Sequence, residues 1–150
     1  MHEVFRQIEQ DFPHHVARAQ RLVRQLSISA TGEGIRECAA LVAEVIEDLG
    51  GRATVVETAG NPVVSGELWT DRPATLLLYG MYDVQPAAEP GWTVPPFDGA
   101  LREVPPFGAC LVARGATNSK GPLAGFLNAV DAYRRSGTPL PVNLLFMVEG

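Results

Sequence analysis

Apolar residues recur at helical spacing in three stretches of the chain. The first covers most of residues 1–29, the second runs from about 34 to 49, and the third from about 120 to 135. Pro13 interrupts the first stretch, and because proline breaks a helix interior, we expect a kink there or a new helix starting after Asp11. Gly50-Gly51 ends the second helix in the manner of a left-handed cap.

The remaining apolar segments are short and strand-like. Residues 53–58 and 63–69 predict an antiparallel pair. The continuous apolar runs 74–79 and 142–148 are typical of strands covered on both faces, and 109–113 predicts a further strand. Residues 85–108 are rich in proline without a periodic pattern, so we expect a functional loop there. Strands alternating with helices predict an α/β fold with a mixed sheet flanked by helices.

Composition excludes several classes of function. The 150 residues carry a net charge of −5 without a run of basic residues, so we expect no nucleic-acid binding. The longest apolar runs are too short to span a bilayer, and the N-terminus lacks the pattern of a signal peptide, so we expect no membrane association and a cytoplasmic location. Two cysteines do not make a disulfide framework.

Candidate chemistry lies in two segments next to predicted strands. One is residues 80–86, which follow the strand 74–79, and the other is the loop 114–122 before the last helix. Asp83 is the candidate from the residues alone, because a carboxylate at a strand end can orient or bind a ligand, although the residues alone favour a turn or capping role. Thr117, Asn118 or Ser119 is expected to cap the helix.

Other residues support structural interpretations. His14 and His15 are adjacent on a helix, which favours a solvated face over a metal site, and Cys38 lies on an apolar helix face as a buried thiol. Trp92 and Phe97 could line a pocket or pin the proline-rich loop, and the sequence favours neither.

Two long motifs also carry a family resemblance. The segments LLLYGMYDVQPAAEPGWTVPPFD and RGATNSKGPLAGFLNAVDAYR resemble the two metal-site segments of the M20 family of metallopeptidases, most closely its dipeptidase branch. The resemblance implies a zinc-peptidase-like (phosphorylase/hydrolase-like) catalytic domain, of which residues 1–150 are the N-terminal portion. It also implies two zinc ions, and hydrolysis of a small peptide or N-acyl amino acid by metal-activated water.

The sequence departs from the family pattern at two ligand positions. Asp83 matches the catalytic aspartate that orients a ligand, but Met81 stands where the family has a zinc-binding histidine, and Asn118 stands where it has the aspartate that bridges the metals. A thioether and a neutral amide are poor substitutes for these ligands. The chain also ends at Glu149-Gly150, before the family's catalytic glutamate pair.

These departures predict that the chain by itself is inactive and does not bind zinc normally. The alternative from a different class of function is a non-catalytic interaction module, a pseudoenzyme relic that pairs with itself or with an active paralogue. It is motivated by the lost ligands beside an otherwise intact framework, and the pairing would use the incomplete sheet, which we expect to expose an apolar edge or face. A deliberately engineered change of ligands is a third possibility.

Overall fold

The computed structural model describes all 150 residues, which form four helices and six strands. The helices are α1 (His2–Gln10), α2 (Phe12–Arg24), α3 (Ile35–Asp48) and α4 (Lys120–Arg135). The strands are β1 (Arg52–Val56), β2 (Val63–Leu68), β3 (Thr75–Met81), β4 (Ala100–Val104), β5 (Gly108–Val112) and β6 (Asn143–Glu149). None of the helices has the length and apolar character needed to cross a membrane.

The helix boundaries confirm the predictions from periodicity. The first helical stretch divides at Asp11, and proline occupies the first turn of α2, where its missing N–H removes no helical hydrogen bond. Gly50, which follows α3, has φ +83°, the left-handed conformation predicted for the glycine pair. The third helical stretch corresponds to α4.

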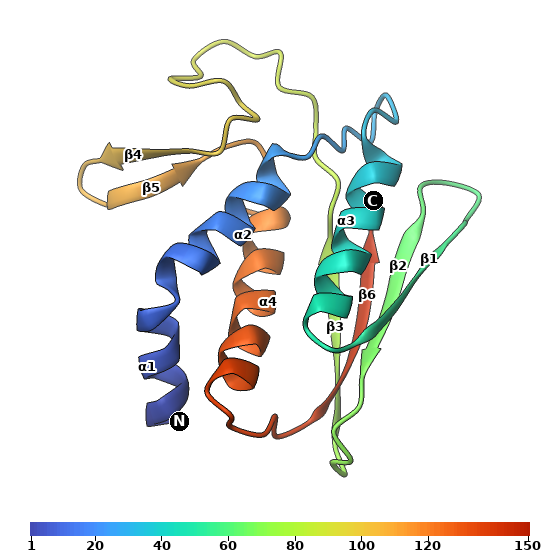
Figure 1. Ribbon diagram of the computed structural model, residues 1–150. Helices are drawn as coiled ribbons and strands as arrows, with labels where there is room; N and C mark the ends of the chain where they lie inside the picture. Colours follow the sequence, from blue (N-terminus) through green and yellow to red (C-terminus); the bar gives the residue numbers. More distant parts are fainter.

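Four strands form one mixed sheet in the order β1-β2-β6-β3. β2 runs antiparallel to β1 and β6, and β3 runs parallel to β6. Alternate residues of the strands face inward, where α3 and α4 cover the sheet (Figure 1). The core between these layers includes Val42, Ile46, Leu127, Leu144, Phe146 and Val148. The α/β fold with a mixed sheet and flanking helices is therefore as predicted.

The outer face of the sheet contradicts the prediction that β3 and β6 are covered on both faces. Leu77 and Tyr79 of β3 are 55% and 56% exposed, and Met147, which pairs with Tyr79, is 48% exposed. β3 is also an edge strand. The apolar run predicts burial on two faces, but within this chain the helices bury only one, and an apolar outer face remains.

A second correction concerns the proline-rich segment. Residues 100–104 are not loop but strand β4, which pairs with β5 in a hairpin that stands away from the main sheet (Figure 1). Two contacts from α2 fix the base of the hairpin. Gln20 Nε2 donates to the Gly99 carbonyl over 2.8 Å, and Arg24 Nε donates to the Asp98 carbonyl over 2.7 Å.

Candidate functional site

The two segments singled out in the sequence meet at one cavity. The cavity has a volume of about 180 Å³ and lies between the end of β3 and the loop that joins β5 to α4. Met81 and Asp83 line it from the first segment and Asn118 from the second. The structure thus brings the three sequence candidates together, while their chemical roles stay predictions. Arg114, Gln85 and Ser119 also line the cavity.

Two glycines allow the second segment to fold tightly against the first. Gly115 has φ +82°, and a Cβ on it would lie 2.6 Å from Val84 Cγ1. Gly121 donates its N–H to the Gly115 carbonyl over 3.1 Å. Ser119 occupies the N-cap position of α4, as one of the capping alternatives predicted, but its side chain makes no capping hydrogen bond. Its hydroxyl therefore remains free on the cavity side.

Tyr82, between Met81 at the end of β3 and Asp83 just beyond it, fixes this segment to the core. Its side chain is fully buried and its hydroxyl donates to the Pro62 carbonyl over 2.7 Å. Its carbonyl accepts a 2.6 Å hydrogen bond from Ser27 Oγ. Because neighbouring strand residues point to opposite faces, burying Tyr82 turns Met81 and Asp83 towards the cavity.

A buried cation ties the second segment to the same region. Lys120 is fully buried, and its ammonium donates to the Gln25 carbonyl beyond the end of α2. Burial lowers the pKa of Lys120 and raises the pKa of the neighbouring Cys38 thiol. Cys38 is the buried structural thiol that the sequence predicts. Lys120, in contrast, had no sequence signal for burial, since lysine at a helix start is normally exposed.

The buried phenol gives the stability of the protein an alkaline limit. Burial raises the pKa of Tyr82 from 10.0 to about 12. The unfolded chain therefore releases this proton at lower pH than the folded one, and stability that is present below pH 10 is lost as the pH rises towards 12. The loss amounts to about 3 kcal/mol for this group. We expect Tyr82→Phe to be less stable than the parent at neutral pH, where it loses a hydrogen bond, and to lose less stability between pH 10 and 12.

Urea unfolding at a series of alkaline pH values measures this difference directly. Tyr133→Phe is the control, since it removes a phenol from α4 that donates only to Met1 Sδ, and the pH dependence of its stability should run parallel to that of the parent. Equal slopes for Tyr82→Phe and the parent would contradict the assignment.

Arg114 is the functional candidate that sequence reasoning passed over. Its guanidinium lies 5.1 Å from the centroid of the Trp92 ring and forms an ion pair with Glu89, so two residues of the proline-rich segment hold it. Its Nε is buried and has no hydrogen-bond partner. The sequence left open whether Trp92 lines a pocket or pins the proline-rich loop. Its contact with Arg114 supports the second role, because it fastens the loop to the cavity wall. The sequence signal was only the match of Arg114 to the family motif.

The side chains at the cavity do not suit the two zinc ions that the resemblance implies. Asp83 is the only carboxylate that lines the cavity, Met81 offers a thioether and Asn118 a neutral amide. Zinc prefers imidazole, thiolate and carboxylate, and two adjacent cations need negative charge between them. The Arg114 guanidinium also lines the cavity, but it is paired with Glu89 and offers a metal no lone pair. No three His, Cys, Asp or Glu side chains of the chain gather in an arrangement that could hold a metal.

The histidine pair is not a metal site either, but the prediction of a solvated face is wrong for His15. His15 is 5% exposed, and its Nε2 lies 3.9 Å from Asp131 Oδ2, while His14 Nε2 lies 3.4 Å from the same oxygen. Arg18 donates to this carboxylate over 2.9 Å. Burial lowers the pKa of His15. Because Arg18 on α2 pairs with the Asp131 carboxylate on α4, the cluster joins these two helices.

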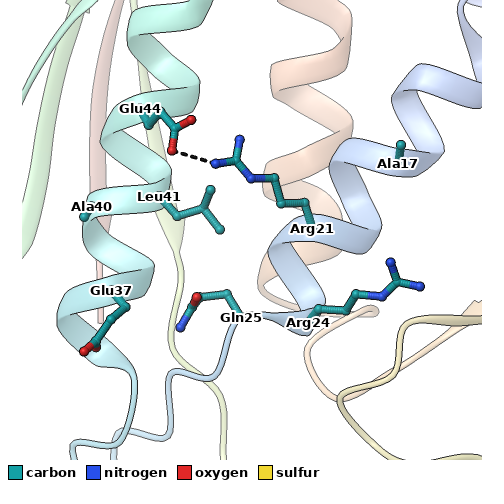
Figure 2. A pocket seen from close by; sticks show the side chains of 8 residues that line it. All are labelled: Ala17, Arg21, Arg24, Gln25, Glu37, Ala40, Leu41 and Glu44. Carbon is teal, nitrogen blue, oxygen red and sulfur yellow. Dashed lines mark hydrogen bonds and ion pairs between the residues drawn. The ribbon is translucent and has the colours of Figure 1, made fainter.

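A wide groove with a volume of about 660 Å³ lies between α2 and α3 (Figure 2). Its charged groups are largely satisfied within the protein. Arg21 reaches across to Glu44 at 2.6 Å, and Arg24 is held by the hairpin base. The groove contains none of the motif residues, so the smaller cavity at the ends of β3 and β5 remains the candidate site.

Comparison with known proteins agrees with the motifs. Residues 77–150 match the profile of peptidase family M20/M25/M40. The Cys-Gly metallodipeptidase DUG1 of Candida albicans is 32% identical over 98% of this chain, and the human Beta-Ala-His dipeptidase is 36% identical over 74% of it. The crystal structure of human carnosine dipeptidase 1 superposes with a TM-score of 0.86 and 32% identity over 99% of this chain.

The coverage of the relatives is partial. The chain spans 33% of DUG1, 24% of the human Beta-Ala-His dipeptidase and 34% of the carnosine dipeptidase 1 structure. The match is to part of their catalytic fold, including both segments that line the cavity. Residues 77–150 thus carry the sequence pattern of peptidase family M20/M25/M40, and the chain is similar along nearly its whole length to part of the named dipeptidases.

Proposed function

We propose that this protein is a non-hydrolytic relative of the M20 dipeptidases, whose former metal site is a metal-free pocket. The observation that carries the proposal is the set of side chains at one cavity: a thioether at Met81, an amide at Asn118 and a guanidinium at Arg114, with the single carboxylate of Asp83. The named relatives are a metallodipeptidase and a Beta-Ala-His dipeptidase.

The chemistry of amide hydrolysis supports this proposal. A bound metal would lower the pKa of water and polarise the substrate carbonyl, and a nearby carboxylate would take the proton. The ligand set needed for that metal is changed at both Met81 and Asn118. Asp83 can still orient a ligand through its carboxylate oxygens, so the pocket keeps a capacity to bind while the means of activating water is lost.

Hydrolysis of Cys-Gly and β-Ala-His by the protein at its natural length tests the proposal. With zinc or manganese added, we expect no turnover above that of the Asp83→Ala variant. Metal-dependent hydrolysis that disappears in Asp83→Ala would overturn it. A human carnosine dipeptidase sample run in parallel controls for the quality of the assay.

A second candidate function is self-association through the uncovered sheet face. The half-exposed side chains of Leu77, Tyr79 and Met147 lie side by side on β3 and β6, and an apolar face of this kind favours contact with a second copy of the chain. Such a module would act by pairing rather than by catalysis.

Lysine substitution separates this face from other exposed apolar residues. We expect Leu77→Lys with Met147→Lys to raise the dissociation constant of a dimer at least about tenfold, because the contact would bury two charges. Leu101→Lys, on the hairpin, is the matched control and should leave association unchanged. Sedimentation velocity over a range of concentrations measures both, and a monomer at every concentration would rule out the interaction module.

A further inference from the structure

Apart from Arg114, which pairs with Glu89, the polar side chains around the cavity at Asp83 have no side-chain partner within the protein. The Asp83 carboxylate and the amides of Gln85 and Asn118 line the cavity without side-chain hydrogen bonds. Ser119 is 7% exposed, and its hydroxyl makes no capping bond. The buried Arg114 Nε also lacks an acceptor. Of these groups, Arg114 Nε is buried without a partner, and such a group costs about 1–3 kcal/mol. Asp83 is half-buried, and the amides of Gln85 and Asn118 are exposed and open to a polar ligand.

Two charged side chains of opposite sign line the cavity. Arg114 supplies a guanidinium that Glu89 and Trp92 hold in place, and Asp83 supplies a carboxylate from the opposite segment. A guanidinium recognises a carboxylate through paired hydrogen bonds, and a half-buried carboxylate recognises an ammonium group. A small ligand that carries both groups would satisfy both walls.

An apolar hollow adjoins the polar cavity. It has a volume of about 130 Å³ and shares Met81, Asn118 and Ser119 with the polar cavity. Its other walls include Leu78, Pro122 and Leu123. A ligand whose charged head lies in the polar cavity can therefore place an apolar side chain in the second hollow, where burial of that side chain adds affinity.

We infer that this pocket binds a free α-amino acid with an apolar side chain, without a metal. Arg114 holds the α-carboxylate, Asp83 holds the α-ammonium, and Leu78 and Leu123 contact the side chain. The inference rests on the proposed function, because two zinc ions in the same space would displace the ligand head. It adds the chemical class of the ligand to the proposal of a metal-free pocket.

Isothermal titration of the natural-length protein with L-leucine in the presence of EDTA tests the inference. We expect saturable binding. L-leucinamide, which lacks the carboxylate, and N-acetyl-L-leucine, which lacks the ammonium, should each bind at least about tenfold more weakly, since each loses a charged hydrogen bond. Glycine should also bind more weakly, because it lacks the side chain. These ligand comparisons need no variant and do not depend on the folding of one.

Variants then assign the two ends of the ligand. Arg114→Leu should weaken L-leucine binding at least about tenfold and leave L-leucinamide binding little changed. Asp83→Asn should weaken L-leucine binding by a similar factor and leave N-acetyl-L-leucine binding little changed. Arg102→Leu on the hairpin removes an exposed arginine away from the cavity and is the control. No saturable binding of L-leucine, or equal affinity for L-leucinamide, would overturn the inference.

A parallel titration with zinc separates this inference from the proposed function. If neither zinc nor L-leucine binds, the metal-free pocket stands and the amino-acid ligand is wrong. If zinc binds, or L-leucine binds only with zinc present, both proposals are wrong.

Discussion

Replacing Gly121 with alanine is expected to cost more than about 4 kcal/mol of stability and to disrupt the cavity. A Cβ at this position would lie 1.8 Å from the Ala116 carbonyl oxygen and 2.8 Å from its carbon. Both atoms belong to the backbone, so no side-chain rotation relieves the clash. The loop would have to separate from the start of α4, which carries Ser119 and Lys120 into place.

Gly125→Ala in the same helix is the matched control. A Cβ there meets nothing within 4 Å, and alanine is favoured over glycine in a helix interior by about 0.5–1 kcal/mol. Urea unfolding followed by circular dichroism should therefore show opposite shifts for the two variants. A Gly121→Ala protein as stable as the parent would contradict the close packing of the loop.

The double variant Met81→His with Asn118→Asp is expected to gain zinc affinity of at least about 100-fold over the parent. An imidazole and a carboxylate would replace the thioether and the amide at positions that line one cavity with Asp83. Titration of each protein with zinc against a chelating indicator measures the gain. In the protein at its natural length, recovery of dipeptide hydrolysis by this variant would mean that only the metal ligands had been lost.

The same residue types placed elsewhere control for non-specific metal binding. Met147→His with Asn61→Asp makes the same changes on the outer sheet face and in the turn before β2. This protein should bind zinc no better than the parent. If the two double variants gained affinity equally, Met81 and Asn118 would not lie at a former metal site.

Much of the fold follows from local pattern. The break at Pro13, the left-handed Gly50 and the periodicity of α3 and α4 depend on neighbouring residues, so they can be read from the sequence. The exposure of β3 depends on whether anything covers the outer face of the sheet, and this cannot be predicted from a run of apolar residues. β4 was missed because its pairing with β5 is set by the hairpin, while its own sequence shows no apolar alternation.

The candidate site also contains residues that the sequence predicted and residues that depend on the tertiary fold. The motifs singled out Met81, Asp83 and Asn118, and the structure brings all three to one cavity. The position of Arg114 against Trp92 could not be predicted, because it depends on how the proline-rich segment folds back over the cavity. The burial of Lys120 depends likewise on the segment that follows α2.

We propose above that the cavity beside Asp83 does not hold the family's metal ions. The most direct test is the metal content of the protein at its natural length, purified without chelator, dialysed against zinc and measured by mass spectrometry. We expect far less than one zinc ion per chain. Two zinc ions per chain, lost on substitution of Asp83 by alanine, would contradict it.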